Sequence, residues 1–232
     1  VSFLDPLQMQ NISKEELFKA ACCNLSESFE TNATVDVSFT DAVTGAKEIQ
    51  MLGLSGKYGL ISQEQMPGVR GIAIPYGLLY TPGAWIESIQ ISKGAGSVTQ
   101  GYESMTGQIN VELKKPADTD KLLLNGYFNE AYRSEINFFT KANVSPMFTT
   151  ALMGHYSIVP KEHDRNGDGF TDMPKGNLLT FANRWDYHNN KTGLEGQLNV
   201  QWVRDRKEGG EVSHDEDHHG LYRIDIDADR IQ

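Results

Sequence analysis

The sequence lacks any uninterrupted run of about 18 apolar residues, so it contains no transmembrane helix. It is also poor in positive charge, because 21 Lys and Arg stand against 31 Asp and Glu and leave a net charge of -10. Without a basic face to neutralise phosphates, we expect no nucleic-acid partner. The two cysteines, Cys22 and Cys23, are adjacent and can pair only with local backbone strain. We therefore expect no disulfide framework and interpret both as small apolar helix residues rather than as a metal or redox site.

The motifs of nucleotide-binding and catalytic sites are missing as well. The G-A-G at 94–96 is followed by Thr99 where a dinucleotide-binding fingerprint requires its third glycine. The G-K at 56–57 is followed by Tyr58 where a phosphate-binding loop requires Ser or Thr. Neither G-x-S-x-G nor H-E-x-x-H occurs in the chain. We therefore do not expect an enzyme.

The first half of the chain predicts a mixture of helix and strands. Ser13 and Glu16 have the spacing of a capping box, and apolar residues at helical spacing follow them up to Phe29. Residues 35–39 alternate as a strand, and a short apolar strand follows at 49–54. The segment 74–83 is rich in aromatic residues, glycine and proline, so we expect an irregular loop there.

The second half predicts a series of strands of about ten residues each. In these strands apolar residues alternate with polar ones, as Leu198 and Val200 do with Asn199 and Gln201. Asn183 is a polar exception on an otherwise apolar face. This pattern fits transmembrane barrel strands, and it also fits a soluble antiparallel sheet with one wet face. We place the strands near 121–130, 134–144, 147–158, 177–188 and 193–204.

The links between these strands differ in length in an alternating order. The links at 145–146 and 188–192 are short, whereas those at 159–176 and after Asp205 are long and charged. Outer-membrane barrels have short turns on the periplasmic side and longer loops outside. The alternation therefore favours a barrel over a soluble sheet.

The most specific stretch lies between the two halves, at 86–116. An alternating strand leads into a glycine-rich turn, and a second alternating strand follows and stops at Pro116. This stretch resembles the end of the plug domain of TonB-dependent outer-membrane receptors, with Lys93-Gly94, Gly101, Gly107 and Ile109-Asn110-Val111 in register. The segment 50–54 departs from the family pattern, because Leu52 stands in the position of an arginine.

The resemblance implies an α+β plug domain at 1–116, followed at 117–232 by antiparallel β-strands of an incomplete transmembrane β-barrel. A closed barrel of this family has about 22 strands, so we expect the chain to be a fragment of a longer protein. The implied location is the bacterial outer membrane. The implied partners are its lipid, a TonB-type energy-transducing protein and a small-molecule cargo, for which we favour an iron complex or other metal chelate over an oligosaccharide or peptide. The alternative from another class is a soluble, calcium-stabilised β-rich adhesion or binding domain.

Two groups of residues are candidates for binding the cargo. Tyr58, Tyr76 and Tyr80 lie in loops that, by the resemblance, rise towards the cargo, although the same rings could pack the plug against the barrel wall. His214, His218 and His219 lie among acidic residues, a composition that suits transition metals. The alternative for the histidine segment is a solvated acidic loop.

A calcium site is predicted at 164–172. Asp164, Asn166, Asp168 and Asp172 occupy positions 1, 3, 5 and 9 of a calcium-binding loop, with Gly169 at position 6. Position 12 is Lys175, so the bidentate glutamate of a complete EF-hand is missing. We expect a structural Ca²⁺ there, and the alternative is a polar loop rich in turn-forming residues.

Overall fold

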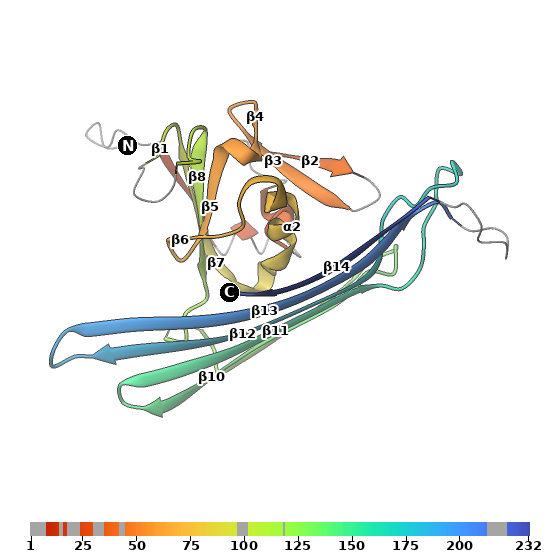
Figure 1. Ribbon diagram of the computed structural model, residues 1–232. Helices are drawn as coiled ribbons and strands as arrows, with labels where there is room; N and C mark the ends of the chain where they lie inside the picture. The colour runs from red at the N-terminus through yellow and green to blue at the C-terminus, as the bar shows by residue number, and fades with distance from the viewer. Residues whose placement is uncertain are drawn as a thin grey trace. The chain divides into compact units, whose positions relative to one another are not determined.

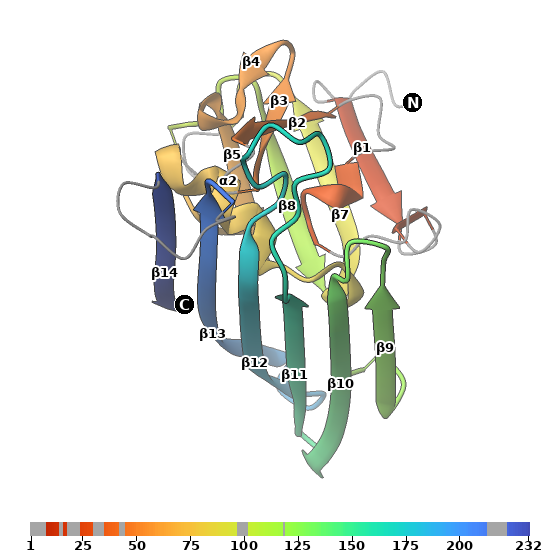
Figure 2. The ribbon, with the colours of Figure 1, turned by 90° about the vertical axis from the view of Figure 1, so that its right-hand side faces the viewer.

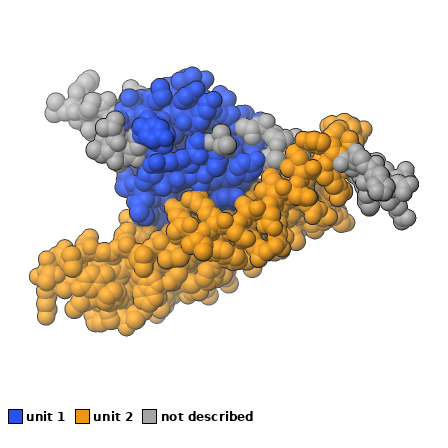
Figure 3. All heavy atoms as spheres, viewed as in Figure 1, with its two compact units in different colours: residues 1–40, 46–114 blue, residues 41–45, 115–232 orange. Residues whose placement is uncertain are grey.

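The computed structural model describes residues 8–13, 16–17, 24–29, 35–41, 45–96, 102–117, 119–212 and 222–232. The chain forms two compact units (Figure 3), which are residues 1–40 with 46–114 and residues 41–45 with 115–232. The division follows Lys114, close to the predicted boundary after Pro116. Within the described ranges, no helix is long and apolar enough to cross a membrane.

Unit 1 is built around a five-stranded sheet with the order β1-β7-β8-β5-β6 (Figure 1). The alternating strands predicted at 86–93 and 107–113 are confirmed as β7 and β8, and their apolar residues Ile89, Ile91, Ile109 and Val111 are buried. β5 and β8 run parallel, and the other pairs are antiparallel. The strands are β1 (Gln8–Ser13), β5 (Gly59–Gln63), β6 (Met66–Pro67), β7 (Ile86–Lys93) and β8 (Gly107–Leu113).

Asn110 is a polar residue in the centre of this apolar sheet, with only 3% of its surface exposed. Its Oδ1 accepts hydrogen bonds from Ser62 Oγ at 3.0 Å and from the Gln65 backbone N–H at 2.9 Å. Its Nδ2 donates to Glu112 Oε1 at 2.8 Å. Glu64 and Gln65 form the β5–β6 turn with φ of 53° and 63°, a region that residues other than glycine adopt rarely. Asn110 therefore ties β8 to a strained turn, which gives a physical reason for asparagine at this position.

The remaining elements of unit 1 are short. A three-stranded sheet has the order β2-β3-β4, and a series of helical turns covers most of residues 71–85. The prediction of an irregular loop at 74–83 is wrong. Pro75 lies in the first turn of α2, where its missing N–H costs nothing, and Ile74 and Leu78 are buried. The elements are β2 (Val35–Asp41), β3 (Ala46–Met51), β4 (Leu54–Ser55), η2 (Gly56–Tyr58), η3 (Gly71–Ala73), α2 (Ile74–Gly77), η4 (Leu78–Tyr80) and η5 (Gly83–Trp85).

The N-terminal helix prediction holds in part. The capping-box contact is present, because the Ser13 backbone N–H donates to Glu16 Oε2 at 3.0 Å, and residues 16–17 are helical. Asn24 forms an isolated bridge with Pro82, so the helix does not continue to Phe29 as expected. Phe29 instead ends the separate turn η1 (Glu27–Phe29). Cys22 and Cys23 lie outside the described residues.

Unit 2 is a six-stranded antiparallel sheet in which every strand pairs with its neighbours in sequence (Figure 2). All five predicted strands are present, and a sixth, β14, was not predicted. β13 also continues beyond its predicted end at 204. The prediction stopped too early because residues 204–208 are all charged, which is typical of a loop. The strands are β9 (Leu122–Phe128), β10 (Ser134–Ser145), β11 (Phe148–Val159), β12 (Lys175–Asn189), β13 (Leu194–Gly210) and β14 (Arg223–Ile231).

The exposed side of the unit 2 sheet carries large apolar residues. We call this side the apolar face; it carries Leu124, Ile136, Phe148, Phe181, Trp185, Leu198 and Val200. The opposite side, which we call the polar face, buries polar and charged residues among smaller numbers of large apolar ones; the polar residues are Asn137, His155, Thr180, Arg184, Gln201 and Asp205, and Phe139, Met153 and Val203 lie among them. The contrast between neighbours is large, since Val200 is 47% exposed and Gln201 is 4% exposed. Unit 2 therefore exposes large apolar side chains on one side and buries polar and charged side chains on the other, which is unusual for a soluble protein.

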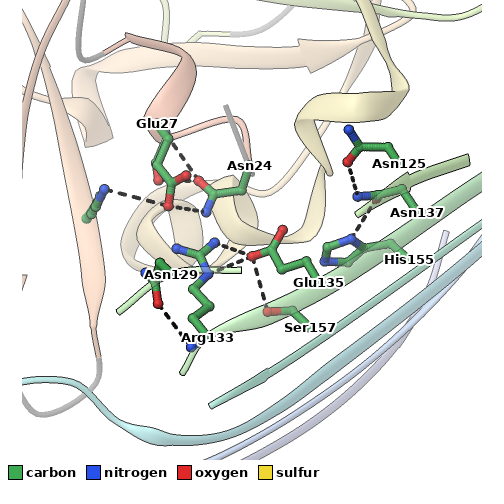
Figure 4. A network of polar contacts seen from close by, with 11 residues as sticks. Asn24, Glu27, Asn125, Asn129, Arg133, Glu135, Asn137, His155 and Ser157 are labelled. Carbon is green, nitrogen blue, oxygen red and sulfur yellow. Dashed lines mark hydrogen bonds and ion pairs between the residues drawn. The ribbon is translucent and has the colours of Figure 1, made fainter. Parts of the chain in front are cut away.

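Hydrogen bonds and ion pairs connect the buried groups of the polar face (Figure 4). Glu135 Oε1 lies 2.5 Å from Arg133 Nη2 and accepts a hydrogen bond from Ser157 Oγ at 3.2 Å. Asn137 Oδ1 lies 2.8 Å from His155 Nδ1. The same pairing between residues two apart recurs between Arg184 and Asp186 on β12, at 2.9 Å, and between Asp205 and Lys207 on β13, at 3.0 Å. Glu135, Arg184 and Asp205 thus each have an oppositely charged partner two residues away in the chain.

Asn183, the polar exception on the apolar face, is also satisfied by its neighbours. Its Nδ2 donates to the Ala151 carbonyl at 3.0 Å and to Thr150 Oγ1 at 3.2 Å. Its Oδ1 accepts a hydrogen bond from Trp185 Nε1 at 2.5 Å. Both the nitrogen and the oxygen of this amide therefore have hydrogen-bond partners on the apolar face.

The alternation of link lengths is confirmed by the order of the strands. The links β10–β11 and β12–β13 lie at one end of the sheet, and both are short. The links β11–β12 and β13–β14 lie at the other end and are longer, at 160–174 and 211–222. Beside the long links the apolar face becomes charged, where Arg206 pairs with Asp227 at 3.5 Å and Arg204 with Asp229 at 4.0 Å.

Candidate functional site

Three connections of unit 1 meet at one end of its five-stranded sheet. The pairing register places the first residues of β5 and β8, Gly59 and Gly107, beside the last residue of β7, Lys93. The Met51 side chain of the β3–β4 hairpin reaches the same point, because a Cβ on Gly107 would lie 2.5 Å from its Cε. We call the described residues 51–58, 93–96 and 102–107 the apex. The chain leaves unit 1 from the opposite end of the sheet, after Leu113.

Backbone hydrogen bonds hold the parts of the apex together. The Tyr58 carbonyl accepts from the N–H groups of Met105 and Thr106, at 2.9 and 3.1 Å. Gly94 donates to the Thr106 carbonyl and Gly96 to the Ser104 carbonyl, both at 2.9 Å. Gly107 has no room for a side chain, since a Cβ would lie 2.4 Å from the Ser92 carbonyl oxygen. Gly94 and Gly107, two of the glycines that carry the family resemblance, therefore help to form this end of the sheet.

Large apolar and aromatic side chains are exposed at the apex. Tyr102 is 82% exposed and Leu52 is 62% exposed, and Leu54, Tyr58 and Met105 are exposed as well. Leu52 and Gly53 form the two-residue tip of the β3–β4 hairpin, with φ of 54° and 73°. Positive φ at both positions is typical of a type I′ turn, which favours Asn, Asp or Gly and is strained for leucine.

The apex is more positive than the chain as a whole. Lys57 lies over the Tyr58 ring, with Nζ 5.2 Å from its centroid, and Lys93 ends β7. In the described part of the chain, neither lysine has an ion-pair partner. Glu103 is held by Arg70, whose Nε lies 3.5 Å from its Oε1. Glu48, at the margin of the apex, accepts a hydrogen bond from Ser55 Oγ. The carboxylates are thus engaged within the protein, and the lysines are available to a ligand.

The three tyrosines predicted to contact cargo do not share one location. Tyr58 lies at the apex and is exposed. Tyr76 is half-buried in α2, and Tyr80 is 8% exposed in the core of unit 1. Of these three tyrosines, Tyr58 alone is both exposed, at 37%, and placed at the apex. His214, His218 and His219 lie outside the described residues.

Sequence reasoning missed the exposed residues Leu52, Tyr102 and Met105 at the apex. A signal for Leu52 was present, because Leu52-Gly53 separates two apolar stretches by the two residues of a tight hairpin. For Tyr102 and Met105 no local signal exists. Their position depends on the pairing of β5 with β8, which are far apart in sequence.

In the predicted calcium loop at 164–172, the carboxylates accept hydrogen bonds from the backbone of the loop itself. Asp164 accepts hydrogen bonds from the N–H groups of Gly167 and Gly169, at 2.7 and 3.0 Å. Asp172 Oδ2 accepts from the Arg165 N–H at 2.7 Å, and Asp168 Oδ1 accepts from the Phe170 N–H at 2.8 Å. Among the described residues, no three side chains of His, Cys, Asp or Glu come together to hold a metal ion. Calcium binding by Asp164, Asn166, Asp168 and Asp172 stays a prediction.

The same loop joins the neighbouring links at its end of the sheet. Arg165 pairs with Glu130 of the β9–β10 turn at 3.0 Å, and His163 stacks on Tyr132 with ring centroids 6.1 Å apart. On the other side, the Thr171 N–H donates to the Gly210 carbonyl at 2.8 Å. The loop therefore connects the turn before β10 with the end of β13.

Comparison with solved structures identifies the fold. The ferric-catecholate import receptor Fiu from E. coli K12 aligns with a TM-score of 0.63 at 15% identity, over 89% of this chain and 28% of its own. The siderophore receptor PiuA from Acinetobacter baumannii gives 0.64 at 14%, over 90% and 28%. The pyoverdine outer membrane receptor FpvA from Pseudomonas aeruginosa gives 0.67 at 15%, over 89% and 29%. The fold is that of a TonB-dependent receptor.

Unit 1 corresponds to the plug of that fold and unit 2 to its first barrel strands, which confirms the predicted fold class. The chain spans less than a third of the length of these receptors. The sequence itself matches no protein-family model and no curated protein. The likeness is therefore one of structure, at identities of 14 to 15%.

Proposed function

We propose that the chain forms the plug and first barrel strands of a bacterial outer-membrane receptor that imports a metal chelate, most simply an iron complex. In this proposal the cargo binds from outside, and a TonB-type energy-transducing protein acts on the plug to open a path. The barrel strands contact the lipid of the outer membrane.

The observation that carries the proposal is the exposed apolar face of unit 2, together with the polar and charged groups that are buried on its other side. In water, the exposed side chains of the apolar face would leave a patch larger than soluble monomers usually tolerate. Against lipid, the same face is favourable, and the buried polar face suits the interior of a barrel. The charged pairs Arg206–Asp227 and Arg204–Asp229 lie beside the long links, as expected where strands leave the apolar layer.

The proteins of similar fold support an iron chelate as cargo. Fiu is a ferric-catecholate import receptor, PiuA is a siderophore receptor, and FpvA was solved with pyoverdine bound. Oligosaccharide and peptide cargoes have no comparable support among these structures. At the present identities, the chelate class for this chain is our proposal.

Uptake of radiolabelled ferric chelates by cells with and without the complete receptor tests the proposal. We expect uptake that requires the receptor and that stops when the proton-motive force is collapsed by an uncoupler. A receptor that binds chelates but delivers iron equally without the proton-motive force would contradict energy-coupled import.

The alternative, a soluble calcium-stabilised adhesion domain, is separated by fractionation of the same cells. The receptor proposal expects the complete protein in the outer-membrane fraction, released only by detergent. Recovery as a soluble protein without detergent would support the adhesion domain instead.

A further inference from the structure

We propose that Asn166 is a site of spontaneous deamidation whose rate is controlled by the carboxylate of Asp164. The site lies in the link between β11 and β12, and the proposal does not depend on the proposed receptor function. The sequence contains two Asn-Gly pairs, at 125–126 and 166–167. Such pairs are especially susceptible to deamidation, because glycine has no Cβ and leaves the backbone nitrogen after asparagine unhindered.

The reaction takes place within the pair itself. The backbone N–H of Gly167 loses its proton to the solvent, and the nitrogen attacks Cγ of Asn166. A bond forms between these two atoms, the Cγ–Nδ2 bond breaks, and Nδ2 takes up a proton and leaves as ammonia. Water then opens the resulting succinimide ring to aspartate or isoaspartate. The overall reaction consumes a water molecule and releases ammonia, so its co-reactant is the solvent.

Two features of the link favour this reaction. Asn166 and Gly167 are both exposed, so water reaches them. The Asp168 N–H donates to Asn166 Oδ1 at 3.0 Å. This oxygen gains negative charge when the nitrogen attacks Cγ, and a donor that is already aimed at it stabilises that charge. The amide carbon of Asn166 is therefore prepared for attack.

Asp164 opposes the same reaction by holding the nucleophile. The Gly167 N–H donates to Asp164 Oδ1 at 2.7 Å, so its proton points at a carboxylate. Removal of this proton would place an amide anion beside that carboxylate, and a neighbouring like charge disfavours an anion. The Gly169 N–H donates to the other oxygen of Asp164 at 3.0 Å and keeps the carboxylate in place. The folded link therefore protects Asn166 although the pair is exposed.

Deamidation would change the contacts of this link. Asn166 Nδ2 donates to Asp168 Oδ2 at 2.9 Å, and this hydrogen bond is lost when an oxygen replaces the nitrogen. The product places a new carboxylate beside Asp168, and the two like charges repel each other. Isoaspartate also lengthens the backbone by a methylene group. The modification therefore loosens the link.

Mass spectrometry of the complete receptor, incubated in detergent with a chelator at neutral pH, measures the modification. Cleavage after lysine releases the two Asn-Gly pairs in separate peptides, 122–141 and 162–175. Replacement of an amide by an acid raises the peptide mass, and digestion in heavy-oxygen water marks any deamidation that occurs during digestion. We expect Asn166 to react at least about tenfold more slowly in the folded receptor than in the urea-denatured chain, because a hydrogen bond to a charged group must first break.

Three variants assign the protection. Asp164→Ala frees the Gly167 N–H and should speed the deamidation of Asn166 at least about tenfold over the wild type. Asp164→Asn keeps the shape and an acceptor but removes the charge, so it should speed the reaction about threefold. Asp172→Ala is the matched control. It removes the acceptor of the Arg165 N–H, at 2.7 Å, leaves the Gly167 N–H bonded, and should react at a rate close to that of the wild type.

The pair Asn125–Gly126 is an internal reference on the same molecules. It lies within β9, and Asn125 Oδ1 accepts a hydrogen bond from Asn137 Nδ2 at 3.3 Å. The Asp164 variants should leave its rate of deamidation unchanged. Equal acceleration at both pairs would attribute the effect to general unfolding of the receptor and would overturn the proposal.

The remaining outcomes concern Asn166 alone. If Asp164→Ala reacts at the wild-type rate, or if Asp172→Ala is accelerated as much as Asp164→Ala, control by Asp164 is overturned. A denatured chain in which Asn166 stays unmodified would remove the site itself. Where Asp164→Ala does not assemble, Asp164→Asn decides, because it keeps the shape of the native residue. A rate for this variant equal to that of the wild type would overturn the proposal.

Discussion

The two sheets of this chain use the same alternating pattern with opposite results. In β8 the apolar residues Ile109 and Val111 are buried, whereas in β13 Leu198 and Val200 are exposed and Gln201 is buried. Alternation thus specifies which residues share a face, but not which face meets water. The second decision depends on what surrounds the sheet, which we propose to be the core of unit 1 for β8 and lipid for β13.

Each sheet also contains one asparagine among apolar neighbours, and both are satisfied. Asn110 bonds to β5, to the β5–β6 turn and to Glu112, and Asn183 bonds to β11 and to Trp185. Asn110 stabilises a strained turn from within a core. Asn183 only satisfies the hydrogen-bonding groups of its own amide. We therefore expect the asparagine of unit 1 to contribute more to stability than the asparagine of unit 2.

The largest expected difference concerns the two units expressed separately. Residues 8–115, which keep β1 in the sheet, should fold alone into a compact, soluble unit, because the apolar residues of β7 and β8 are buried. Residues 121–204 should aggregate without detergent, because the apolar face and the open sheet edges have no partner. Size-exclusion chromatography measures both. A soluble, monomeric fragment 121–204 would contradict the claim that the apolar face of unit 2 needs lipid to cover it.

A charge placed on the apolar face should be costly in proportion to its depth. Val200→Arg, in the middle of this face, should destabilise the receptor in lipid vesicles by about 2 to 4 kcal/mol. Asn177→Arg, on the same side of the sheet but beside the charged pairs, should cost at most about 1 kcal/mol. Urea unfolding in vesicles measures both. Equal costs for the two variants would contradict a lipid-facing apolar face.

Asn110→Ala should destabilise unit 1 by about 2 to 3 kcal/mol, because it removes the side-chain acceptor that the Gln65 N–H and Ser62 Oγ share in the centre of the sheet. Hydrogen exchange of the amides in β5 and β8 reports this loss locally in the complete protein. Gln108→Ala, on the same strand and half-buried, is the control, with an expected change below about 0.5 kcal/mol. Unchanged exchange in Asn110→Ala would show that the strained turn does not depend on Asn110.

The smallest expected effect concerns the loop at 164–172. If a calcium ion binds there with a Kd of about 1 mM, about 1 mM calcium should stabilise the receptor by about 0.4 kcal/mol. The double variant Asp164→Ala with Asp168→Ala should lose this calcium-dependent gain. Melting curves with calcium and with a chelator measure it. An equal calcium-dependent shift of the melting temperature in wild type and variant would show that no calcium ion binds to this loop.

Much of this fold was predictable from the sequence, and the failures have physical causes. Strands with one apolar face were predicted correctly, because alternation survives in either environment. β14 was missed because its exposed side carries Asp225, Asp227 and Asp229, whose charges suggest a loop. That Asp227 and Asp229 pair with arginines of β13 becomes known only from the strand register. α2 was missed because Pro75 and Gly77 were interpreted as breakers, although proline is favourable in a first helical turn.

The candidate site was predictable only in part. Tyr58 was identified, whereas Tyr80 is in the core and the exposure of Tyr102 depends on long-range pairing. The strain at Leu52 is a backbone property that its residue type would not suggest. Local sequence therefore predicts strands and faces well, and predicts the meeting of distant loops poorly.

The most direct test of the account is a scan of spin labels along β13. Cysteines are placed singly at 197–202, with Cys22 and Cys23 replaced by alanine, and the complete receptor is folded in lipid vesicles. The account predicts a period of two: labels at 198, 200 and 202 accessible to dissolved oxygen in the lipid, and labels at 197, 199 and 201 shielded from it. The opposite phase, or equal access at neighbouring positions, would contradict the claim that the exposed apolar face of unit 2 lies against lipid.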